Sequence, residues 1–177
     1  MKNDCEFKTE RLIVEDWLHQ NEDVPAKLKF AKKINRILTP EVTKQLPDGW
    51  QHINTLDQAN KWIFDRANEG LFLTVNMRSG KELIGFVFLY EPENDDTITD
   101  LRFGYLIGQS FWGKGLGTEL INGLIDWCEK TKEIKSLSGG VENDNVASIK
   151  VMEKNGFTLS NQSKPTDNVL FYERNIK

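Results

Sequence analysis

Residues 108–118 of the chain are Gly-Gln-Ser-Phe-Trp-Gly-Lys-Gly-Leu-Gly-Thr, and this stretch decides the interpretation of the whole sequence. An apolar segment ends just before it, and apolar residues at helical spacing follow it. The alternating glycines let the backbone approach a ligand closely and turn successive N–H groups toward it. The N-terminus of the following helix adds partial positive charge. The stretch therefore predicts a cradle for phosphate oxygens between a strand and a helix.

Two nucleotide-binding motifs with similar glycines fit this stretch poorly. A nucleotide P-loop has the spacing found from Gly108 to Lys114, but it needs Ser or Thr next as a magnesium ligand, and Gly115 stands there. A Rossmann fingerprint needs Gly-x-Gly-x-x-Gly early in a doubly wound sheet. Here the spacing is Gly-x-Gly-x-Gly, and too few of the 177 residues follow Gly117 to complete such a domain.

The segments around the glycine-rich stretch alternate between strand and helix patterns. Apolar runs at 71–75 and 83–90 flank the turn residues 78–81, which predicts an antiparallel hairpin, and the second run is apolar on both faces. A third strand is expected at 97–107. The other expected elements are a strand at 9–14, a helix opened by Asp23-Val24-Pro25 with Leu28, Ala31, Ile34 and Leu38 on its apolar face, a loop at 39–53, a helix from Thr55 or Asp57 to the C-cap glycine Gly70, a helix after Gly117, a strand at 137–141, a helix at 146–154, and strands at 157–159 and 169–175.

This order of elements predicts an α/β fold. We expect one central mixed sheet, mostly antiparallel and flanked by helices, in a single domain over residues 1–177.

Composition and charge exclude several classes of protein. Hydrophobic residues make up 38% of the chain and charged residues 28%, which is typical of a folded globular protein. The net charge of −4 leaves no surplus of Lys and Arg for binding nucleic acid. No apolar run approaches the roughly 18 residues that span a bilayer, and residues 1–10 lack the apolar core of a signal peptide, so we expect no membrane contact and a cytoplasmic location. The two Cys and two His residues show no metal-binding spacing.

Motifs spread over nearly the whole chain resemble those of the GCN5-related N-acetyltransferases, most closely the branch of ribosomal-protein acetyltransferases. The similar residues are Thr9-Glu10-Arg11-Leu12, Leu83-Ile84-Gly85, Gly104-Tyr105, Phe111 to Glu119, Asn145 with Ser148, and Met152-Glu153-Lys154-Asn155-Gly156-Phe157. Together these motifs are specific, whereas each alone is weak. The resemblance implies the single-domain α/β fold of that family and direct transfer of an acetyl group from acetyl-CoA to an amine.

The resemblance also implies where acetyl-CoA binds. In the family the glycine-rich loop holds the pyrophosphate, and the strand before the loop pairs with the pantetheine arm through backbone groups. Carried over to this chain, the cofactor-binding residues are Tyr105, Leu106 and Ile107 in the strand, Trp112, Gly113, Lys114, Gly115, Leu116, Gly117 and Thr118 in the loop, and Asn145. Trp112 departs from the Gln or Arg that is common at the first loop position.

Acyl transfer needs a deprotonated amine, a hydrogen-bond donor for the thioester oxygen and a group that stabilises the departing thiolate. The resemblance implies a backbone N–H near Leu106 as the donor. The wider family uses a Tyr where Met152 stands, so Ser148 becomes the group that the branch would place near the sulfur. A second interpretation stays open, in which Asn145 is a helix N-cap and Ser148 merely fills the third helical position.

The general base and the acceptor site are less strongly marked. Arg102 stands where the branch often has Glu, which leaves Asp100, two residues away on the same strand face, as a candidate base. Glu142, at the end of the next strand, is a second candidate, and both acids also fit a solvated surface position. Trp50, in the expected loop, is the candidate for the groove that receives the amine.

The sequence therefore predicts an acetyl-CoA-dependent N-acetyltransferase that acts on the primary amine of a protein N-terminus or a small molecule and needs no metal. Three alternatives stay open: transfer from another acyl-CoA such as succinyl-CoA, a CoA-binding sensor that has lost its chemistry, and a nucleotide-binding domain with coincidental glycines. Met152 and Arg102 motivate the sensor. Exposed strand pairs near the C-terminus make a homodimer plausible.

Overall fold

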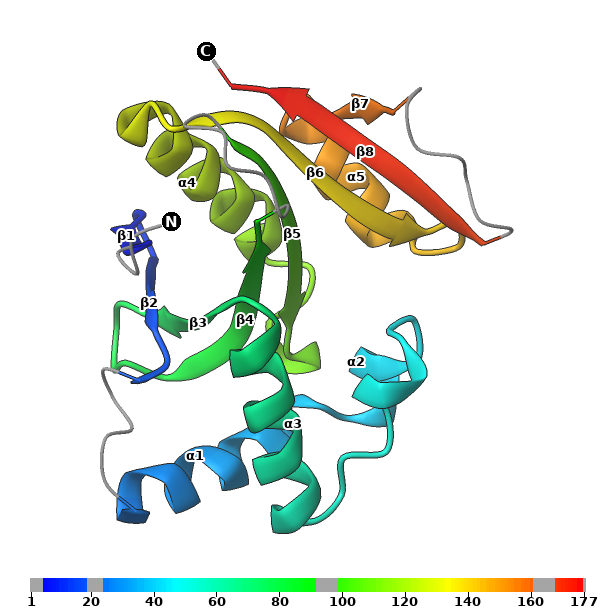
Figure 1. The fold of residues 1–177 in the computed structure, drawn as a ribbon. Coiled ribbons are helices and arrows are strands. Elements are labelled where there is room, and N and C mark those ends of the chain that lie inside the picture. Colours follow the sequence, from blue (N-terminus) through cyan, green and yellow to red (C-terminus); the bar gives the residue numbers. More distant parts are fainter. Residues whose placement is uncertain (1–4, 19–23, 92–98, 161–167, 177) are drawn as a thin grey trace.

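An eight-stranded sheet forms the centre of the computed structural model, which describes residues 5–18, 24–91, 99–160 and 168–176 (Figure 1). In space the strands follow the order β1, β2, β3, β4, β5, β6, β8, β7. Along the chain the elements are β1 (Phe7–Lys8), β2 (Leu12–Asp16), α1 (Val24–Ile37), α2 (Pro40–Thr43), α3 (Leu56–Glu69), β3 (Leu71–Met77), β4 (Leu83–Tyr90), β5 (Thr99–Ile107), α4 (Leu116–Thr131), β6 (Ile134–Glu142), α5 (Val146–Lys154), β7 (Thr158–Leu159) and β8 (Val169–Asn175).

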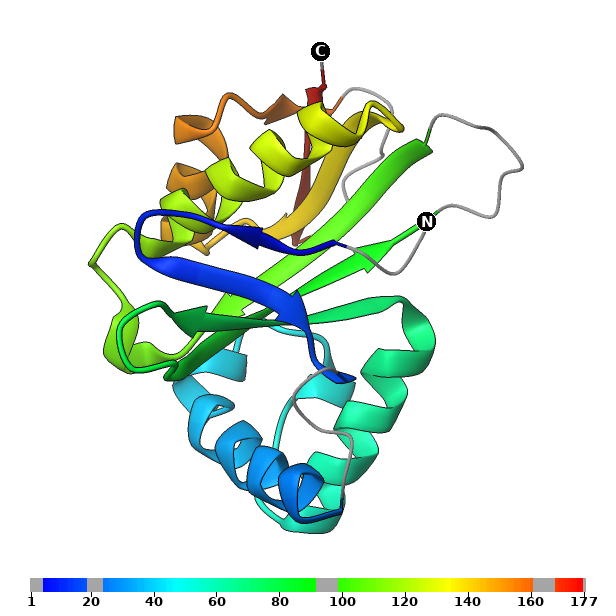
Figure 2. The same cartoon turned by 90° about the vertical axis from the view of Figure 1, so that its left-hand side faces the viewer.

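Helices cover both faces of the sheet. Figure 2 shows α4 on one side and α1 and α3 on the other. The apolar stripe of α4 repeats at helical spacing and is buried in one core cluster with residues of the sheet and with Met152 of α5. The stripe consists of Leu116, Leu120, Ile121, Leu124, Ile125 and Cys128. On the opposite face, Ile34 and Trp62 belong to one buried cluster with Phe86 and Phe88 of β4. Within the described ranges, no helix is long and apolar enough to cross a membrane.

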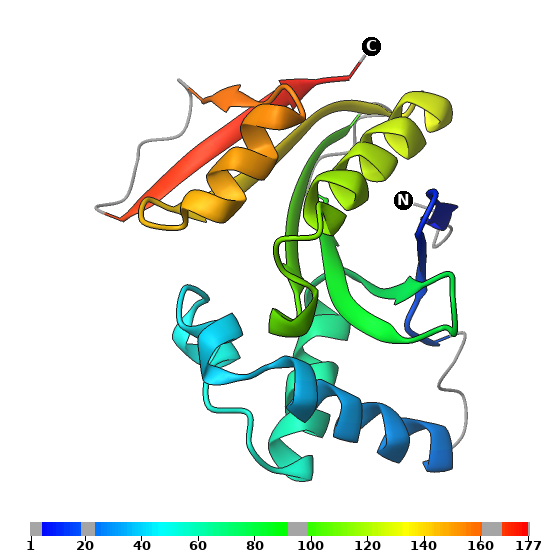
Figure 3. The same ribbon diagram turned by 180° about the vertical axis from the view of Figure 1, so that it is seen from behind.

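The last part of β5 has a strand partner on one edge alone among the described strands. β4 pairs with β5 as far as Ile107, but the parallel pairing of β5 with β6 ends at Arg102 and Ser138. β8 pairs with the other edge of β6 from Ser136 to Glu142, so β6 continues past Ser138 with β8 as its partner. The two strands therefore diverge (Figure 3), and among the described strands none pairs with the outer edge of β5 beyond Arg102.

Most of the fold expected from the sequence is confirmed. The sheet is mixed and flanked by helices, and β5 with β6 is the one parallel pair among the described strands. The hairpin of β3 and β4 is present, β4 is buried along almost its whole length, and α5 has the expected bounds. The strand expected at 9–14 is a hairpin of β1 and β2, because Thr9 Oγ1 accepts the Leu12 N–H and closes a turn.

Predictions for the first helical region need correction. Leu28 does not belong to the buried face of α1, since its side chain is 45% exposed, and Phe30 is buried there instead. The segment 39–53 is not a plain loop: it contains α2 and a 3₁₀ turn at Asp48–Trp50. Asp23, the expected helix cap, lies outside the described residues.

Gly70 follows α3 for a different reason from the one expected. Its φ of 171° is extended, so it is not a left-handed helix cap. A Cβ at this position would lie 2.3 Å from the Leu89 carbonyl oxygen, so the close approach of the neighbouring strand requires glycine. The homodimer expected from the C-terminal strands stays a prediction, with β7 forming one edge of the sheet.

Candidate active site

A pocket of about 580 Å³ lies where β5 and β6 diverge. The end of β5, the glycine-rich loop and the first turns of α4 and α5 line it. Of the residues singled out in the sequence, it brings together Tyr105, Leu106, Ile107, Trp112, Gly113, Gly115, Leu116, Gly117, Thr118, Asn145 and Ser148. The fold therefore assembles one site from both motifs, the glycine-rich stretch and the helix start after Asn145.

Two left-handed glycines shape the loop. Gly113 has a φ of 73° and Gly115 a φ of 75°, values that residues with a side chain rarely adopt. Gly115 is the N-cap of α4 and supplies no side chain that could cap the helix. The first N–H groups of α4 consequently stay available to a ligand, and their partial positive charge suits an anion such as phosphate.

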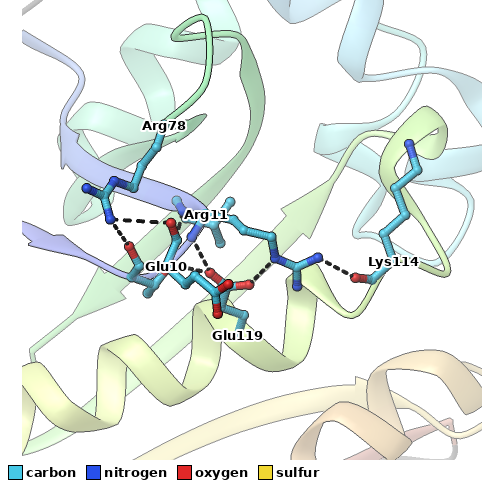
Figure 4. A network of polar contacts seen from close by, with 7 residues as sticks. Glu10, Arg11, Arg78, Lys114 and Glu119 are labelled. Carbon is cyan, nitrogen blue, oxygen red and sulfur yellow. Dashed lines mark hydrogen bonds and ion pairs between the residues drawn. The ribbon is translucent and has the colours of Figure 1, made fainter.

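An ion pair behind the loop ties it to the N-terminal hairpin (Figure 4). Arg11 Nε donates to Glu119 Oε2 at 2.6 Å, and Arg11 Nη1 donates to the Lys114 carbonyl at 3.0 Å. Glu119 Oε1 also accepts the Arg11 backbone N–H at 2.7 Å and Thr9 Oγ1 at 2.6 Å. Arg78 Nη1 holds the same turn by donating to the Thr9 carbonyl at 2.9 Å. These bonds fix the position of the loop relative to the first turn of α4.

Glu119 stays charged in this arrangement. Partial burial alone would raise the pKa of the Glu119 carboxyl, but the hydrogen bonds from Thr9 and from the backbone and side chain of Arg11, together with the Arg11 charge, lower the pKa below its ordinary value. The ion pair with Arg11 therefore persists at neutral and mildly acidic pH.

The open edge of β5 presents backbone groups of Tyr105 and Ile107 rather than of Leu106. The Gly108 N–H donates to the Ile84 carbonyl of β4, and hydrogen-bonded positions alternate along an antiparallel ladder. The N–H and C=O of Leu106 consequently point at β4, whereas those of its two neighbours point at the pocket side. The backbone donor expected near Leu106 stays a prediction, and the N–H groups that face the pocket side there are those of Tyr105 and Ile107.

Two side chains of the loop make contacts that the sequence did not predict. Trp112 Nε1 donates to the Ile107 carbonyl at 2.6 Å, which pins the loop to the open edge of β5. Lys114 Nζ donates to the Ser110 carbonyl at 2.9 Å, and Lys114 is not among the residues that line the pocket. The cofactor contact expected of Lys114 therefore stays a prediction.

Ser148 faces the pocket from the first turn of α5. Asn145 is the N-cap of this helix, and its Oδ1 accepts the Ser148 backbone N–H at 3.1 Å, so the capping interpretation is confirmed. The Ser148 hydroxyl takes no part in the cap and lies 3.4 Å from Tyr105 Oη. Capping and a place in the pocket therefore coexist at the same helix start.

The two carboxylates considered as bases lie outside the lining of this pocket. Asp100 is at the opposite end of β5, about 16 Å from Tyr105 at the rise of an extended strand. Its Oδ1 accepts Ser136 Oγ at 2.6 Å. Glu142 is the last residue of β6 and pairs with Val169 of β8. The direction of β5 and the divergence of β6, neither visible in the local sequence, account for both placements.

Trp50 lies on the face of the sheet that α1 and α3 cover. The centre of the Trp50 ring is 4.6 Å from that of Phe88 and 5.7 Å from that of Trp62. The Arg66 guanidinium lies over the Trp50 ring, 4.4 Å from its centre. Trp50 is not among the residues that line the pocket. Its place in the acceptor groove stays a prediction.

The sequence analysis missed the far wall of the pocket. This wall is formed by α2 and the residues after it: Glu41, Val42, Lys44, Gln45 and Leu46. Gln45 Nε2 donates to Asp144 Oδ1 at 3.0 Å, which joins the wall to the turn before α5. Thr39 followed by Pro40 is a recognisable helix start, and Thr39 does cap α2. Nothing in the local pattern, however, shows that this helix faces β5.

Neither cysteine is available as a nucleophile. Cys5 and Cys128 are buried free thiols, and burial raises the pKa of the Cys128 thiol to about 12. Among the residues that the structure describes, no three His, Cys, Asp or Glu side chains gather in a group that could hold a metal ion.

A family model for the acetyltransferase (GNAT) domain matches residues 11–158. The chain belongs to the GNAT acetyltransferase family. The match spans β2 through α5, ends at the first residue of β7, and includes every element that lines the pocket. GNAT enzymes take their acetyl group from acetyl-CoA, so the family expected from the motifs and its co-substrate are both confirmed.

A curated protein is similar to this chain in sequence, and solved structures share its fold over nearly the whole chain. The uncharacterized protein YkkB of Bacillus subtilis (strain 168) is 25% identical over 127 residues, which cover 66% of this chain and 71% of that protein. RimL, a ribosomal L7/L12 α-N-protein acetyltransferase solved with coenzyme A, has a TM-score of 0.73 at 17% identity over 97% of this chain and 98% of its own. The ribosomal-protein-S5-alanine acetyltransferase from Vibrio fischeri has a TM-score of 0.73 at 16% identity, with 98% and 97% covered.

Proposed function

We propose that this GNAT protein transfers the acetyl group of acetyl-CoA directly to a primary amine, on a protein N-terminus or a small molecule. The observation that carries the proposal is that the glycine-rich loop, the open edge of β5 and the first turn of α5 converge on the same pocket. The similar folds of two enzymes described as acting on ribosomal proteins make a protein N-terminus the first acceptor class to test.

Three parts of the pocket suit three parts of acetyl-CoA. The uncapped N–H groups after Gly115 are donors for the pyrophosphate. Lys150 and Lys154 of α5, which also line the pocket, add positive charge for its phosphates. The outward-facing backbone groups of Tyr105 suit the amides of the pantetheine arm, because an extended chain readily adds to an open strand edge.

The pocket also offers donors for the transfer itself. As the amine nitrogen attacks the thioester carbon, the C–N bond forms, the C–S bond breaks, its electron pair stays on sulfur, and the nitrogen gives its proton to water. The Ile107 N–H at the open edge is the donor for the thioester oxygen, and the Ser148 hydroxyl is the donor for the departing sulfur. A direct transfer agrees with the inert, buried Cys128.

The test is thiol release from acetyl-CoA in the presence of different amines. The panel contains peptides with free N-termini, the same peptides with blocked N-termini, a polyamine and free amino acids. We expect amine-dependent release by the wild type, and at least about 10-fold lower kcat in Ser148→Ala, because the sulfur loses its donor. Ser136→Ala is the matched control, since that hydroxyl contacts Asp100 outside the pocket.

Two other outcomes would contradict the proposal. Tight binding of acetyl-CoA without thiol release from any amine would favour the sensor. Faster release from succinyl-CoA than from acetyl-CoA would assign a different acyl donor to the same pocket.

A further inference from the structure

Two hydroxyl groups meet inside the pocket from different elements. Tyr105 Oη, on β5, donates to Ser148 Oγ, on the first turn of α5, across 3.4 Å. In the described part of the chain neither hydroxyl has another hydrogen-bond partner. A separation of 3.4 Å is long for an O–H···O bond. Such long separations are common between catalytic groups before the substrate binds.

The ring of Tyr105 is held in place by the fold rather than by a ligand. It packs against the core under α4, and a Cβ at Gly117 would lie 3.7 Å from Tyr105 Cε2. The ring therefore lies between β5 and the first turn of α4, and this packing fixes the position of Tyr105 Oη. Ser148 is fixed from the other side, since the Asn145 cap orders the turn that carries it.

The chemistry of the two hydroxyls sets the direction of the bond. Each hydroxyl has one hydrogen to donate and two lone pairs to accept with. A phenol is a better donor and a poorer acceptor than an alcohol, because its oxygen lone pair is delocalised into the ring. Burial raises the pKa of Tyr105, so the phenol keeps its hydrogen over the physiological pH range. With Tyr105 as the donor, the hydrogen of Ser148 is left for a ligand in the pocket.

We propose that Tyr105 is a positioning residue, whose hydroxyl donates to Ser148 Oγ and thereby directs the Ser148 hydrogen at the sulfur of the coenzyme. This inference rests on the function proposed for the pocket and goes beyond it, since the expected role of Tyr105 was a backbone contact to the cofactor. It also supplies a tyrosine to the site although Met152 stands at the position where the wider family has one. Tyr105 transfers no proton: it orients the group that stabilises the thiolate.

A double-mutant cycle tests the dependence of Tyr105 on Ser148. We expect Tyr105→Phe to lower kcat about 3- to 10-fold, as the loss of one orienting hydrogen bond implies, and to leave KM for acetyl-CoA unchanged. Ser148→Ala is expected to lower kcat further. In the Ser148→Ala background, Tyr105→Phe should have no additional effect, because its target is absent. An equal loss in both backgrounds, or a change in KM alone, would overturn the proposal.

A second measurement needs no amine and so separates this inference from the proposed function. The thiol pKa of bound coenzyme A is followed through the ultraviolet absorbance of the thiolate. The wild type should lower that pKa relative to free coenzyme A, and Tyr105→Phe should reverse part of the shift only when Ser148 is present. Tyr172→Phe, at a buried tyrosine outside the pocket, should leave it unchanged. An unaltered thiol pKa in Tyr105→Phe would refute the role of Tyr105 even if the enzyme acetylates amines.

Discussion

Gly115→Ala perturbs the phosphate loop through the backbone alone. The φ of 75° at Gly115 lies in the left-handed region, which costs a residue with a Cβ about 1–2 kcal/mol. The new Cβ would lie 3.7 Å from Arg11 Nη2, an ordinary contact distance, so no steric clash adds to this cost. A chain of this length should therefore melt about 2–8 °C lower. If the loop relaxes instead, the N–H groups of α4 turn away from the phosphates.

The matched control is Gly80→Ala. Gly80 has a φ of 81° with open space around it, and it lies in the turn between β3 and β4, outside the pocket. Both variants should lose similar stability in thermal melts. In calorimetric titrations with acetyl-CoA, Gly115→Ala should bind about 10-fold more weakly or worse, because about one hydrogen bond to a charged oxygen is lost. Gly80→Ala should bind like the wild type.

The comparison separates loop geometry from general destabilisation. Equal affinity in all three proteins would refute the assignment of the loop to phosphate binding. Equal weakening in both variants would show that the loss follows overall stability and not the shape of the loop.

Two further substitutions, one of them also followed with pH, probe the contacts that hold the loop. Trp112→Phe removes the indole donor to the Ile107 carbonyl, so stability should fall by about 1 kcal/mol and acetyl-CoA affinity several-fold; an unchanged melt and titration would contradict this. Glu119→Gln replaces a carboxylate acceptor by an amide whose NH₂ can face Arg11 Nε. The free energy of unfolding in denaturant at pH 7 should fall by about 1–2 kcal/mol, near the low end because Arg11 is partly exposed. An unchanged free energy of unfolding would argue against the ion pair. Folding lowers the pKa of the Glu119 carboxyl, so the stability that its charged form contributes is complete above the ordinary value of 4.5 and is lost as the pH falls through the folded-state pKa. The difference in unfolding free energy between wild type and Glu119→Gln should therefore shrink on acidification. A difference that stays constant with pH would contradict the shift.

The glycine-rich stretch and the elements near it could be predicted because their signals are local. Helical spacing identified α4, the Asn145 cap located α5, and apolar runs around a turn located the hairpin of β3 and β4. The same local logic failed where tertiary contacts decide. Leu28 fits the helical period but faces solvent, and Gly70 is required by a neighbouring strand rather than by its own helix.

The parts of the site that lie close together in the sequence were predicted, and the parts that come together only through the pairing of strands were missed. The loop and Ser148 lie at element junctions that the sequence marks. Asp100 lies outside the pocket lining because the direction of β5 places it at the other end of the strand, and its role as a base stays a prediction. The contact between Gln45 and Asp144, and that between Tyr105 and Ser148, join segments far apart in the sequence. No periodicity or spacing in a single sequence reports such pairs.

Calorimetric titration of the wild-type protein with acetyl-CoA, beside ATP with magnesium, tests the central claim most directly. The pocket predicts saturable binding of one acetyl-CoA per chain and no comparable heat from ATP, because Gly115 stands where a magnesium ligand would be needed. A folded sample that binds ATP with magnesium and leaves acetyl-CoA unbound would contradict the assignment of the glycine-rich loop, and with it the proposed transfer.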